Sequence, residues 1–67
     1  MSKDRLFLPS ELKQARNCLG LTQEQLALEL GVSRLSVVRW ESGAYKIPFT
    51  VGLAVKYLEI KLIAKQD

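Results

Sequence analysis

The sequence contains no histidine and a single cysteine, Cys18. Without a second cysteine, neither an intramolecular disulfide nor a cysteine-based metal cluster can form. The absence of histidine excludes a histidine-containing zinc site and a histidine general base. We expect Cys18 to be a small apolar residue, buried or half-buried, rather than a reactive thiol. No nucleophile–base pair or carboxylate pair stands out, so the sequence predicts no enzyme, no cofactor and no metal.

Long apolar runs are also missing. No stretch of about 18 apolar residues and no signal peptide is recognisable, so we expect a cytoplasmic protein that does not enter a membrane. The chain has 67 residues, 48% hydrophobic and 25% charged, which indicates one globular domain with a modest core. We divide it into an N-terminal arm, residues 1–8, and a domain, residues 9–67. The net charge of +3 favours an anionic partner, although weakly.

The stretch 21–43 predicts two short helices joined by a tight turn. Thr22 can cap the first helix, and Gln25 three residues later completes a capping box. Gly31 can adopt the positive φ that a helix ending there requires. Ser33 can then cap the second helix. The short spacing between these signals indicates that the two helices pack on each other.

The helix after Ser33 is predicted to have two different sides. Val37 and Trp40 are three residues apart, so they point in the same direction, and we expect both in the core. Another side carries Arg34, Leu35, Ser36 and Arg39. Gly43 is expected to end the helix. A helix with an apolar inner pair and a basic, polar outer edge suits the major groove of DNA.

A helix on each side is expected to complete the domain. Pro9 opens the first, which runs to about Leu19 and ends at Gly20. Pro48 opens the last, which continues to about Ala64 with no strong breaker except Gly52, in about its first turn. Its sequence predicts two opposite apolar stripes at 100° per residue.

One stripe of the last helix must cover the core, and it comprises Val51, Ala54, Val55, Leu58 and Leu62. The other comprises Phe49, Leu53, Tyr57, Ile60 and Ala64. Either the segment Leu6-Phe7-Leu8 covers this second stripe or a second copy of the protein does, and we favour a dimer contact. The same segment either packs back on its own domain or contributes to a subunit contact.

An ordered series of residues carries a resemblance to a known family. It runs Arg16-x-x-Leu19-Gly20-Leu21-Thr22-Gln23-x-x-Leu26-Ala27-x-x-Leu30-Gly31-Val32-Ser33, then Val37-x-x-Trp40-Glu41-x-Gly43 and Pro48. This series resembles the phage repressor/Cro family of helix-turn-helix domains, also called the XRE family, over roughly positions 12 to 58. The resemblance implies an all-α fold: a compact four- to five-helix bundle of the repressor-like type, here with a long last helix. Its third helix would enter the major groove.

The resemblance also implies roles for individual residues. Gln23 would contact the DNA backbone and brace the first recognition residue, although it also suits a solvated position in a first helical turn. The loop 42–46 lies where the family holds a phosphate, or is simply surface. Arg16 and Glu41 match an internal ion pair that ties the first helix to the third. The predicted DNA-binding residues are Thr22, Gln23, Arg34, Leu35, Ser36, Arg39, Ser42, Tyr45 and Lys46.

The recognition helix leaves several alternatives open. Arg34 could bind guanine O6 and N7 in bidentate fashion or contact a phosphate. Arg39 has the same two alternatives. Leu35 could contact a thymine methyl group or occupy a crowded solvent position. Ser36 could reach a base or a phosphate, or bond its own helix backbone.

The sequence therefore predicts a sequence-specific DNA-binding transcriptional regulator. Double-stranded DNA would be its partner, with the recognition helix Ser33–Ser42 in the major groove, and the protein would act as a homodimer on a palindromic site. The alternative is an adaptor or antitoxin-like subunit whose last helix grips a co-encoded protein. An adaptor would not need Gln23, Arg34 and Arg39 on one exposed edge. Many family members have polar residues where Arg34 and Leu35 stand, so the resemblance implies no target sequence.

Overall fold

The structure, a computed structural model, describes residues 7–64, with side chains as far as Leu62. Four helices follow one another: α1 (Pro9–Cys18), α2 (Gln23–Leu30), α3 (Arg34–Ser42) and α4 (Phe49–Ala64). No strand occurs between residues 7 and 64, so the predicted all-α fold is confirmed with four helices. Of the predicted arm, only Phe7 and Leu8 are described. Leu6, the side chain of Ala64 and Lys65 lie outside the described part.

The helix ends follow from local chemistry. The Thr22 hydroxyl accepts from the Gln25 amide at 3.0 Å, and the Gln25 side chain accepts from the Thr22 amide at 2.8 Å. The predicted capping box is therefore present. Ser33 caps α3 by accepting from the Ser36 amide at 3.2 Å. At the turn between the two helices, Gly31 has φ +73°, a conformation in which any Cβ would be strained.

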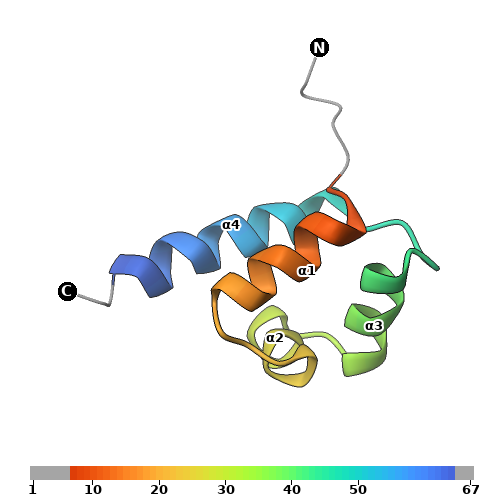
Figure 1. The fold of residues 1–67 in the computed structure, drawn as a ribbon, viewed down its shortest axis with the longest axis horizontal. Helices are drawn as coiled ribbons and strands as arrows, with labels where there is room; N and C mark the ends of the chain where they lie inside the picture. Colours follow the sequence, from red (N-terminus) through yellow and green to blue (C-terminus); the bar gives the residue numbers. More distant parts are fainter. Residues whose placement is uncertain (1–6, 65–67) are drawn as a thin grey trace, which may run out of the picture.

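One core fills the space between the four helices. In Figure 1, α2 and α3 lie together at one edge, and α1 crosses between them and α4. Leu12 from α1, Leu26 from α2, Val37 from α3 and Val55 from α4 are each at most 1% exposed. Truncating one such Leu to Ala costs about 2–5 kcal/mol, which is large for a domain with a total stability of roughly 3–10 kcal/mol. The buried set is Leu12, Ala15, Leu26, Ala27, Val37, Trp40, Ile47, Val51, Val55 and Leu58.

The long last helix is continuous through Ala64, as its sequence predicts. Its inner stripe packs in the core through Val51, Val55 and Leu58. The opposite stripe, called the outer stripe below, is open to solvent. Its described side chains are Phe49, Leu53, Tyr57 and Ile60, which are 67%, 54%, 62% and 70% exposed. A Cβ on Gly52 would lie 3.5 Å from Phe7 Cγ, so Phe7 packs against the helix between the two stripes. The described part of the arm, Phe7 and Leu8, therefore leaves the outer stripe uncovered.

Two features outside the core complete the fold. Cys18 is exposed, so the prediction of a buried or half-buried side chain is wrong. The reason is its position, because it lies about 120° around α1 from Leu12 and about 100° from Leu19, at the outer edge of the buried face. Among residues 7–64, no helix is both long enough and apolar enough to cross a membrane.

Candidate nucleic-acid interface

Helix α3 separates its core residues from its exposed residues. Val37 is 0% exposed and Trp40 is 8% exposed, and both belong to the core. Arg34 and Arg39 are exposed, and Leu35 is 52% exposed. The burial of one side therefore fixes which side chains the helix offers to a partner.

A hydrogen-bonded network around Glu41 lies next to the start of α2. Arg16 Nε donates to Glu41 Oε2 at 2.7 Å, and Arg16 Nη2 donates to Glu41 Oε1 at 3.2 Å. Arg16 Nη1 also donates to the carbonyl oxygen of Leu21 at 2.9 Å. The two charged side chains are only 12% and 5% exposed, so the pair is largely removed from water. It joins α1 to α3 and to the turn that precedes α2.

Gln23 is part of the same network. Its side-chain Nε2 donates to Glu41 Oε1 at 3.1 Å. A carboxylate can only accept, so the NH₂ group of the Gln23 amide must face Glu41. The resemblance implies a DNA-backbone contact for Gln23, and the fold holds this side chain in place before any partner arrives.

The polar side chain of Ser36 is engaged within its own helix. Ser36 is half-buried, and its hydroxyl lies 3.1 Å from the Ser33 hydroxyl. This contact joins two side chains at the helix start, so it differs from the predicted alternative of a bond to the helix backbone.

Ser42 is also engaged, at the other end of α3. Its hydroxyl donates to the Arg39 carbonyl oxygen at 3.1 Å and accepts from the Ala44 amide at 3.3 Å. With its only hydrogen used in this way, the hydroxyl has no donor left for a phosphate. A phosphate contact by this loop then depends on Tyr45 and Lys46, which are both exposed. Thr22 differs, because it only accepts in its cap and keeps its own hydroxyl hydrogen for a further partner.

Arg39 folds over an aromatic ring of the following loop. Its guanidinium carbon lies 5.0 Å from the centroid of the Tyr45 ring, within the range of a cation–π interaction. The turn at Gly43, with φ +85°, brings this loop back beside the end of α3. Tyr45 therefore restricts where the Arg39 charge can point.

The charge on this side of the molecule is positive. Between residues 34 and 46 the charged residues are Arg34, Arg39, Lys46 and one acid, Glu41. Glu41 is neutralised by Arg16 and is turned away from solvent. The exposed charge of α3 and its loop is thus entirely cationic, which suits a phosphate backbone.

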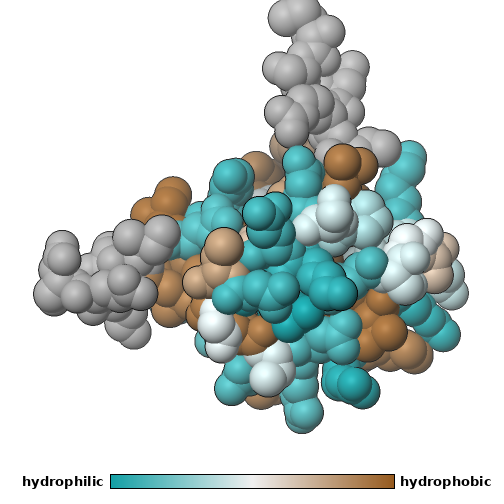
Figure 2. All heavy atoms as spheres, in the orientation of Figure 1, coloured by the Kyte–Doolittle hydropathy of each residue, from teal (hydrophilic) through white to brown (hydrophobic). Residues whose placement is uncertain are grey.

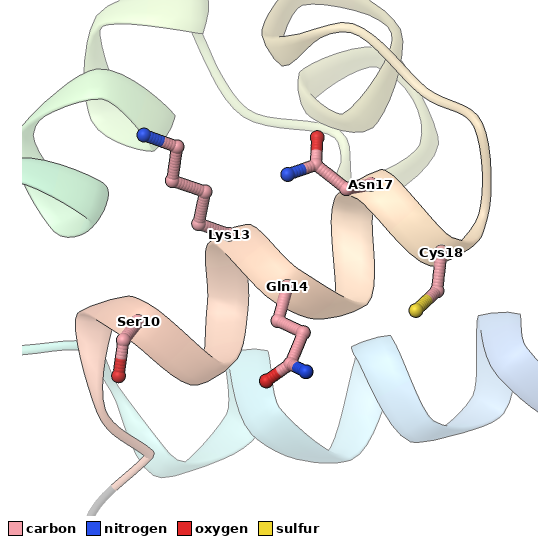
Figure 3. Close-up of a pocket in the computed structure, with 5 residues that line it drawn as sticks. All are labelled: Ser10, Lys13, Gln14, Asn17 and Cys18. Atoms are coloured by element: carbon pink, nitrogen blue, oxygen red, sulfur yellow. The ribbon is translucent and has the colours of Figure 1, made fainter.

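A shallow hollow on α1 lies apart from this surface. It is lined by Ser10, Lys13, Gln14, Asn17 and Cys18, all from a single helix. In Figure 3, Lys13 and Asn17 point away from Ser10, Gln14 and Cys18 rather than toward a common centre. These side chains include no nucleophile–base pair, and among the described residues no group of His, Cys, Asp or Glu could hold a metal ion.

The structure adds residues that the sequence did not single out. Val38 is partly exposed on the outer side of α3, and its spacing of three from Leu35 was the available signal. Ile47, in the loop after α3, is 4% exposed and belongs to the core. No helical period marks a loop residue, so nothing in the sequence pointed to its burial.

Comparison with known protein families gives a match over most of the chain. A protein family described as Helix-turn-helix matches residues 12–60, which is more than half of the chain and includes most of α1, all of α2 and α3, and most of α4. No curated protein matches the chain.

Proposed function

The chain belongs to the Cro/C1-type helix-turn-helix family of DNA-binding domains, and on this premise we propose that it is a sequence-specific transcriptional regulator. In this proposal the exposed side of α3 lies in the major groove. The matched residues include Arg16, Gln23 and Glu41, which form the hydrogen-bonded network, as well as all of α2 and α3.

One observation supports the proposal above the others. Helix α3 buries Val37 and Trp40 while Arg34 and Arg39 remain exposed, and its only acid is paired internally with Arg16. Side chains at the start of a recognition helix reach base edges, which assigns base contact to Arg34. The exposed Lys46 then contacts the phosphate backbone, where contacts position the protein without reading sequence, and Tyr45 holds Arg39 through its ring.

We also propose a homodimer on a two-fold-related site, formed through the outer stripe of α4. From the exposed fractions of its four described apolar side chains, each subunit would bury roughly 400–500 Å². A pair would therefore bury about 800–1,000 Å² in total, at or below the lower limit for a specific interface. Such a dimer is weak in solution and strengthens on DNA, with half-sites about 34 Å apart.

The test is binding of the full chain to DNA selected from a random duplex pool, measured by fluorescence anisotropy at two salt concentrations. Arg34→Ala should weaken binding to the selected site by about tenfold or more, because one bidentate base contact is worth about 1–3 kcal/mol. Lys56→Ala is the matched control, since it removes one exposed cation from α4.

The same measurement separates the proposal from an adaptor function. A regulator should bind DNA more weakly as salt rises, because counterions are released on binding. No binding at low salt would instead favour an adaptor that uses the outer stripe of α4 for a protein partner. Equal loss with Arg34→Ala and Lys56→Ala would reject the role of α3.

A further inference from the structure

The exposed side of α3 is apolar in its middle. Leu35 is 52% exposed, and Val38, three residues later, is partly exposed on the same side. Figure 2 shows apolar side chains reaching the surface over α3, at the lower right of the view. Leu35 and Val38 form what is called here the α3 apolar pair.

The polar side chains beside this pair already have partners in the chain. The Ser36 hydroxyl is bonded to Ser33, and the Ser42 hydroxyl hydrogen is bonded to the Arg39 carbonyl oxygen. Arg39 itself stacks on Tyr45. The exposed surface of α3 between its two arginines is therefore mostly apolar, and its one hydroxyl, on Ser36, is already paired with that of Ser33.

We propose that the α3 apolar pair reads the C5-methyl group of thymine, so that the target carries thymine where Leu35 and Val38 face the bases. This inference rests on the proposed function, since it requires α3 in the major groove. There the thymine methyl is the apolar group that a base pair displays, whereas a G·C pair displays the cytosine amino group and guanine O6 and N7. An apolar side chain against those groups would strip their water without replacing the hydrogen bonds.

The surroundings of the pair favour DNA over a protein partner. Exposed Arg34 precedes it and exposed Arg39 follows it, so a cation stands on each side. Two aliphatic side chains are also far too small to carry a specific protein interface, which buries at least about 1,000 Å². A methyl group matches the small size of the pair, and the phosphates of the two strands on either side match its flanking cations.

The experiment uses three random duplex pools, amplified with thymidine triphosphate, with deoxyuridine triphosphate in its place, or with 5-methyldeoxycytidine triphosphate in place of deoxycytidine triphosphate. The full chain selects from each pool, and bound fragments are sequenced. Uracil lacks only the methyl group, and 5-methylcytosine carries it on a different base pair. We expect a thymine preference that falls about fourfold per methyl contact in the uracil pool, and acceptance of 5-methylcytosine at the same positions.

Protein variants connect that preference to the α3 apolar pair. Leu35→Ala, and separately Val38→Ala, should each lose the preference for thymine over uracil at the position that the truncated side chain faces, with unchanged melting temperatures as the check on folding. Leu28→Ala is the matched control, because Leu28 is a 76% exposed leucine on α2, and it should keep the wild-type preference.

The outcomes separate this inference from the proposed function. If the wild-type chain enriches no sequence from any pool, the proposed function fails. If it enriches the same sequences with equal strength from thymine and uracil pools, DNA binding stands and methyl reading is overturned. A fall in the mass of the protein in solution on Leu35→Ala, with the thymine preference intact, would overturn it in favour of a contact between copies.

Discussion

Gln23 and Glu41, eighteen positions apart on α2 and α3, are joined by a hydrogen bond of 3.1 Å from Gln23 Nε2 to Glu41 Oε1. The same carboxylate also receives two donors from Arg16. A residue that the family resemblance assigns to DNA is thus attached to an ion pair that stabilises the fold. Glu41 therefore links a candidate DNA-contact residue to the stability of the fold, and the first two predictions measure what its bonds to Arg16 and Gln23 contribute to that stability.

Arg16→Ala should lower the free energy of unfolding by about 3 kcal/mol, because breaking a desolvated pair leaves a buried charge without its partner. The Arg16 and Glu41 side chains are 12% and 5% exposed, so the pair is largely removed from water. Urea melts of Arg16→Ala, Glu41→Ala and the double variant measure the coupling, expected to exceed about 1 kcal/mol. Lys13→Ala, an exposed change on the same helix, should stay within about 0.5 kcal/mol. Additive single losses would show that the pair contributes little.

Gln23→Glu should destabilise the protein more than Gln23→Ala does. It replaces the NH₂ donor by a second carboxylate beside Glu41, and like charges at that separation repel by about 1–4 kcal/mol near a protein surface. Gln25→Glu is the matched control, two positions along at an exposed site, where a glutamate still completes the capping box with Thr22. Thermal melts at neutral pH compare the three. Equal stability of Gln23→Glu and Gln25→Glu would mean that the bond to Glu41 contributes nothing.

Tyr45 should act on DNA affinity through Arg39. Tyr45→Leu removes the ring beneath the guanidinium and should weaken binding to a selected duplex about twofold to fivefold, the range of an exposed cation–π contact. Tyr45→Phe keeps the ring and should bind within twofold of the wild type. In an Arg39→Ala background Tyr45→Leu should have no further effect on anisotropy titrations. A full second loss there would mean that Tyr45 contacts the DNA independently.

Ile60→Glu should abolish self-association at concentrations where the wild-type chain dimerises. A charge in the middle of the outer stripe would be desolvated in the interface, which is costly without a partner. Leu28→Glu introduces the same charge at a leucine of similar exposure, 76% against 70%, but on α2. Sedimentation equilibrium of the three proteins gives the masses. A monomeric wild type at every concentration, or equal effects of both substitutions, would remove the proposed dimer.

Much of the fold was predictable because its signals are local. The Thr22–Gln25 capping box, the Ser33 cap and the positive φ of Gly31 each depend on residues within one helical turn. The inner stripe of α4 and the burial of Trp40 follow from a period of 3.6 residues in the same way. Cys18 was predicted wrongly because its residue type was weighed above its angle on α1.

For the candidate site residues, the helices that carry them were easier to predict than their contacts. The resemblance selects Gln23, Arg39 and Ser42 for DNA. Gln23 and Arg39 lie on α2 and α3 as expected, and Ser42, grouped with the loop 42–46, is the last residue of α3. Their hydrogen bonds to Glu41, to the Arg39 carbonyl and to Ala44, and the stacking on Tyr45, emerge only in three dimensions. Val38 could have been found from its spacing of three residues from Leu35. Its residue type did not indicate exposure, because the neighbouring valine, Val37, is buried.

By itself, the sequence determined where helices begin and end and which side of each is apolar, because those properties depend on contacts within about four residues. Only the tertiary structure decided that Glu41 would hold Gln23 as well as Arg16, that Ile47 would enter the core, and that Phe7 would pack on Gly52 and leave the outer stripe of α4 open. Those outcomes depend on how the helices lie against one another, which no local period encodes. The exposed arginines and the apolar pair of α3 are the groups left for a partner once these packing and hydrogen-bonding requirements are met.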